Sequence, residues 1–147
     1  MLKITKTDNV CFISLGGAPA ALAFLADVFD SLARAGVNVD IISQAPPTGH
    51  MSDLAFTVND SDLTPVLNVV AALRERYPSL NSSVSSGNSK ITVSDENMRT
   101  GVGVAARIFQ KLSAALPQAT LITTSEVDIS LLIQGGEADL ALELLSK

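Results

Sequence analysis

The alternation of apolar and polar residues predicts helices and strands in a repeating order along the chain. A helix face is indicated by apolar residues spaced three or four apart: Leu22, Leu25, Phe29 and Leu32. A half-buried strand is indicated where apolar residues alternate with smaller or polar ones: Leu54, Phe56 and Val58. Gly36, which follows the predicted helix, favours a left-handed helix end at that point.

The same order of elements occurs twice, which indicates one supersecondary unit repeated within the chain. Phe29 falls on Phe109 when the two copies are aligned. Three pairs of segments correspond: residues 24–44 with 104–124 and 10–15 with 90–95, both at an offset of 80, and 52–58 with 127–133 at an offset of 75. The difference between the offsets lies at "APPTGH", a loop by its Pro and Gly content.

Each copy reads strand, helix, strand, strand, helix, and the first copy continues into the polar stretch 81–89. We interpret that stretch as a weak strand followed by a flexible turn, which completes a βαββαβ unit. The second copy lacks its last strand, but Leu2 and Ile4 alternate with polar residues as an edge strand would. We therefore expect residues 2–6 to complete the second sheet, with a first domain at 7–88 and a second at 89–147.

The predicted fold is therefore α+β, with two ferredoxin-like βαββαβ units, each an antiparallel four-stranded sheet with helices on one face. Sheet edges left without a neighbour need a partner, so we expect a homodimer. The hydrophobic share of 47% and mean hydropathy of +0.35 are sufficient for a packed core.

Charge and targeting signals narrow the class of function further. A net charge of −5 and a pI near 4.6 argue against nucleic-acid and anionic-membrane partners. The amino-terminal sequence has no apolar run typical of a signal peptide, and no stretch reaches the length of a membrane span. We expect a cytoplasmic protein.

Candidate catalytic chemistry is sparse. His50 is the single histidine and lies in a predicted loop, and Cys11, the single cysteine, lies within an apolar strand. The sequence "GVG" at 101–103 is not followed by the Lys-Ser/Thr of a phosphate-binding loop. We expect these glycines to let the turn from strand to helix pass close to a ligand or partner backbone. We predict no catalytic residue, no metal ligand and no enzymatic activity for this chain alone.

Four stretches in the two copies resemble the paired ACT domains in the C-terminal regulatory region of aspartokinases. They are "NVDIISQ" (38–44), "SDLAFTV" (52–58), "MRTGVGVAARIF" (98–109) and "ITTSEVDISLLI" (122–133). The family typically has Asn-x-Asp before an apolar pair in the first domain, and Thr-Ser-Glu after an isoleucine in the second. The resemblance extends over nearly the whole chain from Val10 onward.

The resemblance implies an amino-acid sensor for feedback control. ACT pairs of this family bind lysine, threonine or both, and they regulate a kinase domain that phosphorylates aspartate. It implies no cofactor, an amino-acid effector as ligand, and an aspartokinase catalytic domain as partner, in the same or a separate chain.

A free amino acid needs backbone N–H groups or a helix start for its carboxylate, and oxygen acceptors for its ammonium group. The resemblance places the effector at eleven positions: Asn38, Asp40, Gln44, Ser52, Asp53, Met98, Thr100, Thr123, Thr124, Ser125 and Glu126. From the residues alone, Asp40 and Asp53 could equally be solvated acids on a strand. For the polar run Thr123 to Glu126, the residues alone favour a polar hairpin turn over an effector site.

The loop after the first strand departs from the family pattern. Ala20 and Ala23 stand where the family has an acidic residue and a glycine. The alternative function is therefore a structural dimerisation module of the ACT type with a degenerate effector pocket.

Overall fold

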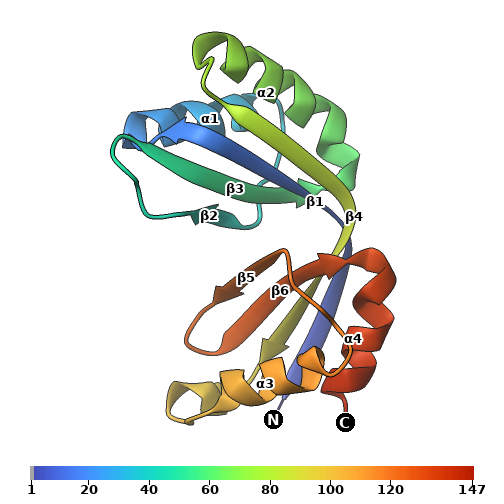
Figure 1. Ribbon diagram of the computed structural model, residues 1–147. Coiled ribbons are helices and arrows are strands. Elements are labelled where there is room, and N and C mark those ends of the chain that lie inside the picture. The colour runs from blue at the N-terminus through green and yellow to red at the C-terminus, as the bar shows by residue number, and fades with distance from the viewer. Residues whose placement is uncertain (1) are drawn as a thin grey trace. The chain divides into compact units, whose positions relative to one another are not determined.

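The computed structural model describes residues 2–147, which form the strands and helices of Figure 1. The strands are β1 (Lys3–Pro19), β2 (Ile42–Gln44), β3 (Met51–Asn59), β4 (Asn81–Ser94), β5 (Leu121–Thr124) and β6 (Asp128–Gln134). The α-helices are α1 (Leu22–Arg34), α2 (Leu63–Arg76), α3 (Val104–Ser113) and α4 (Ala138–Leu145). Short 3-10 turns, η1 (Asp60–Asp62), η2 (Glu96–Arg99) and η3 (Gly135–Glu137), come before α2, α3 and α4.

The chain divides into two compact units. The first unit is Val10–Ser86, and the second joins the chain up to Asn9 with Gly87–Lys147. The first unit has the strand order β2-β3-β1-β4, and the second has β1-β4-β6-β5, so β1 and β4 each contribute to both. In each unit two helices pack together on one face of the sheet (Figure 1). The pairs β1–β3, β2–β3, β4–β6 and β5–β6 are antiparallel, and the predicted fold class is confirmed.

Two predicted breaks in strands do not exist. Residues 2–6 and 10–15, predicted as separate strands, belong to the continuous strand β1 apart from Leu2. The flexible turn predicted within residues 81–89 is wrong, because β4 runs without interruption from Asn81 to Ser94. Gly87 adopts a φ of 72° inside this strand, a backbone conformation that glycine accommodates readily.

Strand register corrects the alignment of the first strands. Leu15 pairs with Leu54 and Val93 pairs with Ile129. Leu54 and Ile129 are equivalent at an offset of 75, so Leu15 corresponds to Val93 at an offset of 78 rather than 80. A shift of two residues leaves the same side chains facing the core, so the apolar alternation could not reveal it.

Each unit has its own apolar core. In the first unit, strand residues such as Ile13 and Phe56 pack against Phe24, Val28 and Leu32 of α1. Leu22, predicted on the buried face of this helix, is 80% exposed, so that part of the prediction is wrong. In the second unit the core joins β4 and β6 to α3 and α4 through residues such as Val93, Ile108, Leu131 and Leu145.

Glycines with a positive φ lie in the chain segments before and after α1. After α1, Gly36 adopts a φ of 77°, and Val37 N–H donates to Leu32 O at 3.0 Å, which confirms the predicted left-handed helix end. Before α1, β1 is irregular between Leu15 and Ala18, where Gly17 has a φ of 65°. A Cβ on Gly17 would lie 2.6 Å from Ser79 O, so this position excludes any side chain.

Gly17→Ala should destabilise the fold more than the matched variant Gly36→Ala. Both positions have a positive φ, but only Gly17 would also force a methyl group into backbone, because nothing lies within 4 Å of a Cβ on Gly36. We expect Gly36→Ala to cost about 1 kcal/mol and Gly17→Ala about 2–3 kcal/mol or more. Urea unfolding followed by circular dichroism measures both, and equal losses would contradict this account.

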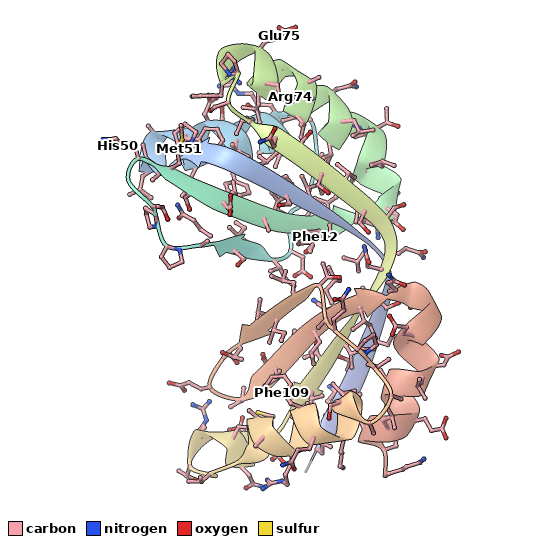
Figure 2. All side chains as sticks on the ribbon, viewed as in Figure 1. Phe12, His50, Met51, Arg74, Glu75 and Phe109 are labelled. Atoms are coloured by element: carbon pink, nitrogen blue, oxygen red, sulfur yellow. The ribbon has the colours of Figure 1, made fainter. Side chains whose placement is uncertain are left out.

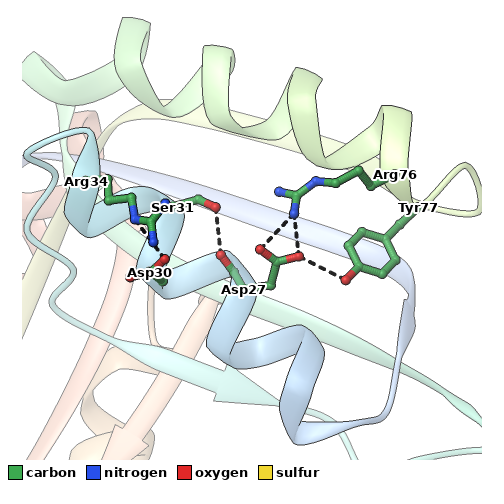
Figure 3. Close-up of polar contacts among 6 residues, drawn as sticks. All are labelled: Asp27, Asp30, Ser31, Arg34, Arg76 and Tyr77. Carbon is green, nitrogen blue, oxygen red and sulfur yellow. Dashed lines mark hydrogen bonds and ion pairs between the residues drawn. The ribbon is translucent and has the colours of Figure 1, made fainter.

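An ion pair on the first unit links its two helices (Figure 3). Arg76 Nη1 donates to both carboxylate oxygens of Asp27, at 2.9 and 2.7 Å, and Tyr77 Oη donates to Asp27 Oδ2 at 2.9 Å. The hydrogen bond from Arg76 is the main reason that the pKa of Asp27 lies below its usual value, and Tyr77 contributes next. The Tyr77 ring meets Phe24 edge-on at 4.9 Å, which anchors this cluster to the core.

Asp27→Asn should lower the melting temperature at pH 7 and flatten the acid side of the stability profile. Because the folded-state pKa of Asp27 is depressed, its contribution is complete above the unfolded pKa of about 3.9 and is lost as pH falls through the folded pKa. The matched control is Asp30→Asn, on the same helix, whose exposed pair with Arg34 is 3.0 Å long. Thermal melts from pH 7 to pH 2 would contradict this account if both variants behaved alike.

Candidate functional site

In the second unit, the connection from β4 to α3 is a structured loop. Asp95 Oδ1 accepts the N–H of Asn97 at 2.9 Å, and this hydrogen bond lowers the pKa of the Asp95 carboxyl group. Asp95 N–H in turn donates to Val127 O at 2.8 Å, which holds the start of the loop against the start of β6. The loop is therefore fixed at its first residue by both its own turn and a neighbouring strand.

Glycines shape the second half of this loop. A Cβ on Gly101 would lie 2.6 Å from Asn97 O, and Gly103 has a φ of 87° directly before α3. Gly103 O accepts the N–H of Arg107 at 3.1 Å, which is the first helical bond of α3, and no side chain caps this helix start. The first N–H groups of α3 thus receive no bond from an N-cap side chain, and they carry the partial positive charge of a helix start.

The turn between β5 and β6 faces this helix start. Ser125 N–H donates to Asp128 O at 3.0 Å, and Ser125 Oγ accepts the N–H of Val127 at 3.3 Å. A pocket of about 250 Å³ lies between the turn and the loop. Its lining residues are Met98, Gly101, Gly103, Val104, Ala105, Thr124, Ser125, Glu126 and Ile129. Four of the sequence-predicted residues, Met98, Thr124, Ser125 and Glu126, therefore line one pocket.

A short chain of charges stands at the edge of this pocket. Arg99 donates through Nη1 to Glu126 and through Nε to Glu96, the latter at 2.9 Å. The hydrogen bond with Glu96 is the main cause that raises the pKa of Arg99 above its usual value, and Glu126 adds to it. The Arg99 and Glu126 side chains are 51% and 79% exposed, so water screens their pairing.

The pocket has the groups that a zwitterionic amino acid requires. The Glu126 carboxylate can accept an ammonium group, and the uncapped N–H groups of α3 can donate to a carboxylate. Met98, Val104 and Ile129 supply an apolar wall for a carbon chain between them. Binding is the chemistry that this arrangement supports, because no nucleophile and base meet among its lining residues.

A corresponding pocket of about 200 Å³ lies in the first unit, at the irregular Gly16–Gly17 segment of β1. It is lined by Gly17, Ala45, Pro46, Thr48, Met51, Ser52 and Asp53. Ser52 Oγ donates to Ala45 O at 2.6 Å, and Asp53 Oδ1 lies 3.5 Å from the position of a Cβ on Gly16. Ala45 and Pro46 are equivalent to Ser125 and Glu126 at the offset of 80, so here the turn carries no acid.

The remaining predicted residues lie outside these pockets. Thr100 belongs to the loop before α3 but does not line the pocket, and Thr123 on β5 pairs with Ser130. Asn38 and Asp40 are exposed in the segment before β2, which is held to β3 by the Asp40 N–H bond to Thr57 O at 3.0 Å. Gln44 is exposed on the edge strand β2.

Sequence reasoning missed the apolar wall of the pocket. Val104, Ala105 and Ile129 are not among the predicted effector-binding residues, although they lie in the stretches 98–109 and 122–133 that resemble the family. Gly101 and Gly103 were expected to allow close approach of a ligand or partner, and both line the pocket. The short glycine spacing was thus the signal that pointed to this loop.

Cys11 and His50, the other candidates for reactive chemistry, lie in ordinary structural positions. Cys11 is fully buried, and burial raises the pKa of its thiol. His50 lies in the exposed turn before β3, next to Met51 (Figure 2). Within residues 2–147 no group of three or more His, Cys, Asp or Glu side chains is placed to hold a metal ion. No helix in this part of the chain is long and apolar enough to cross a membrane.

Known proteins share sequence similarity and fold with this chain. Residues 91–147 match the ACT domain family. The aspartokinase of Geobacillus stearothermophilus is 30% identical over 130 residues, which cover 88% of this chain and 31% of that enzyme. The chain thus spans about a third of the length of the curated relatives that it matches.

Two solved structures match this chain almost end to end. The ligand-free regulatory subunit of aspartate kinase from Thermus thermophilus superimposes with a TM-score of 0.86 at 25% identity, covering 97% of this chain and 94% of that one. A structure of aspartokinase alpha and beta subunits gives a TM-score of 0.85 at 27% identity, covering 97% and 93%.

Fold, repeat and sequence similarity together define a protein of the ACT-domain class. Within that class, the chain is an ACT regulatory region of the aspartokinase type. Its similarity to the regulatory subunits of aspartate kinase from Thermus thermophilus and Thermus flavus covers 97% of the chain in each case.

Proposed function

We propose that this chain is the amino-acid-sensing regulatory part of an aspartate kinase, and that it binds lysine, threonine or both. The observation that carries this proposal is the second-unit pocket, where Glu126, Ser125 and Thr124 face the start of α3 across an apolar wall. A neighbouring pocket also contains an acid, Asp95, and the first residue of α3, Val104, but the cations Arg107 and Lys111 line it as well.

The effector is held at both of its charged ends. Its ammonium group lies against Glu126, and its carboxylate accepts N–H groups at the start of α3 beyond Gly103. A lysine side chain extends along Met98 and Ile129, whereas threonine leaves more of this wall uncovered. The remaining predicted residues, Asn38, Asp40, Gln44, Ser52, Asp53, Thr100 and Thr123, contribute to effector binding in the assembled protein rather than in this pocket.

When no effector is bound, the Arg99 guanidinium group is paired with the Glu126 carboxylate. An exposed ion pair is worth at most about 1 kcal/mol, so an incoming ammonium group displaces the guanidinium at little cost. Arg99 then retains its second acid, Glu96. Effector binding therefore changes which residues the η2 turn is bonded to.

We propose that effector binding regulates the kinase by shifting the population between two conformations of the protein. An effector stabilises the arrangement to which it binds best, and the kinase geometry linked to that arrangement becomes more populated. We place the aspartokinase catalytic domain as partner, in the same or a separate chain, and a homodimer formed through the ACT units in the cytoplasm. As domains we propose residues 7–88 and 89–147, with residues 2–6 in the second, which differs from the two compact units at residues 7–9 and 87–88.

Isothermal titration calorimetry tests the effector site directly. We expect heat of binding with lysine or threonine and none with methionine, and Glu126→Gln should weaken binding at least about tenfold by removing a charged hydrogen-bond acceptor. The matched control is Glu143→Gln, an exposed acid on α4 whose pair with Lys147 is 3.7 Å long. If neither lysine nor threonine gives heat, the proposed function is wrong.

Arg99→Gln should tighten effector binding, because it frees Glu126 without removing any group that the effector uses. The expected gain is roughly two- to fivefold, in line with a weak exposed ion pair. Arg34→Gln, which removes an exposed pair on α1, should leave the affinity unchanged. Weaker binding in Arg99→Gln would contradict the exchange and indicate that Arg99 contacts the effector itself.

The structural dimerisation module remains the second candidate, and the first-unit pocket favours it. That pocket has Ala45 and Pro46 at the turn, where the second unit has Ser125 and Glu126. A dimer that persists in Glu126→Ala and Asp40→Ala, together with no rise in melting temperature from any amino acid, would support this candidate.

A further inference from the structure

An apolar pocket of about 190 Å³ lies in the second unit between α3 and the edge strand β5. Phe109, Leu112, Ile122 and Leu131 form most of its wall, and no charged residue lines it. Ser113 and Gln118 are its polar members. The pocket shares no lining residue with the proposed effector site. Phe109, labelled in Figure 2, is 38% exposed.

The first unit fills the equivalent space with its own side chains. Ile42 pairs with Phe56 in the first unit and Ile122 pairs with Leu131 in the second, so Phe56 and Leu131 are equivalent. Phe29, the counterpart of Phe109, meets the Phe56 ring edge-on, with centroids 5.7 Å apart and planes at 74°. In the first unit, the Phe56 ring therefore packs against Phe29 at the position that Leu131 has in the second unit.

The second unit has smaller residues at two of these positions. Leu131 replaces the ring of Phe56, and Ala119 stands where the first unit has Val39, which packs on the core. Phe109 is thereby left without a ring partner. Dry apolar cavities of about 150 Å³ are known to bind benzene, so the space is large enough for one ring.

We propose that this pocket binds a small uncharged apolar molecule of the size of an aromatic ring, packed edge-on against Phe109. Ser113 Oγ donates to Gln110 O at 3.0 Å, which leaves its lone pairs available, and the Gln118 amide adds a second uncharged polar group. The ligand therefore carries at most an uncharged polar substituent on its outer side. Amino acids are excluded, because no lining group balances an ammonium or carboxylate.

Benzyl alcohol and the benzylammonium ion form a matched pair of probes for the full chain, since they share a ring and differ in charge. In methyl-labelled protein, benzyl alcohol should shift the methyl signals of Leu112, Leu116 and Leu131 with saturation, and benzylammonium should bind at least about tenfold more weakly. Leu131→Phe, which supplies the ring present in the first unit, should abolish these shifts.

Two further variants keep the result interpretable. Ala119→Val fills the pocket less drastically and should weaken benzyl alcohol binding even if Leu131→Phe does not fold. Leu140→Phe adds the same ring on α4 outside the pocket, where Leu140 is 39% exposed, and should leave binding unchanged. Calorimetry with lysine should be unaffected by Ala119→Val, which separates this site from the effector site.

Absence of saturable shifts in the wild-type chain would overturn the proposal, as would equal binding of benzylammonium. A wild-type dimer that excludes benzyl alcohol, and that Leu131→Phe converts to a monomer in analytical ultracentrifugation, would also overturn it. That result would assign the pocket to a side chain of a second copy.

Discussion

The pairing of β1 with β4 is the interaction on which both units depend, because each unit uses a different part of the same two strands. β1 (Lys3–Pro19) and β4 (Asn81–Ser94) are long enough to cross from one unit to the other. The first unit takes its four strands from the consecutive residues Val10–Ser86, whereas the second unit combines two separate stretches of the chain. The second unit takes one of its four strands from the chain up to Asn9.

The strand ends determine where a ligand site can form. In both units the first strand of the repeat ends beside the turn between the next two strands, and a helix starts there. The second unit has Glu126 in its turn and glycines before α3, which leave the helix start open. The first unit has Ala45 and Pro46 in its turn, and Asp53 on β3 is the acid of its pocket. Duplication thus produced two similar pockets with different chemistry.

Periodicity predicted the two copies, their helices and the strands β3 and β6, because burial on one face imposes a repeating pattern. It did not reveal the two-residue shift of the first strands, since Leu15 and Val93 face the core under either alignment. It also placed Leu22 in the core, although the helix there buries Phe24 and Val28 instead. Thr124 to Glu126 were found by resemblance, whereas Val104 and Ile129 join them only through the fold.

The central claim is that an amino-acid effector binds at the start of α3 in the second unit. Backbone amide chemical shifts measured during a titration with lysine or threonine test it most directly, because each amide reports on its own surroundings. The account predicts saturable changes concentrated at Gly103, Val104 and Ala105 and at Ser125 and Glu126. Changes confined to the first unit, around Gly17 and Asp53, would contradict it.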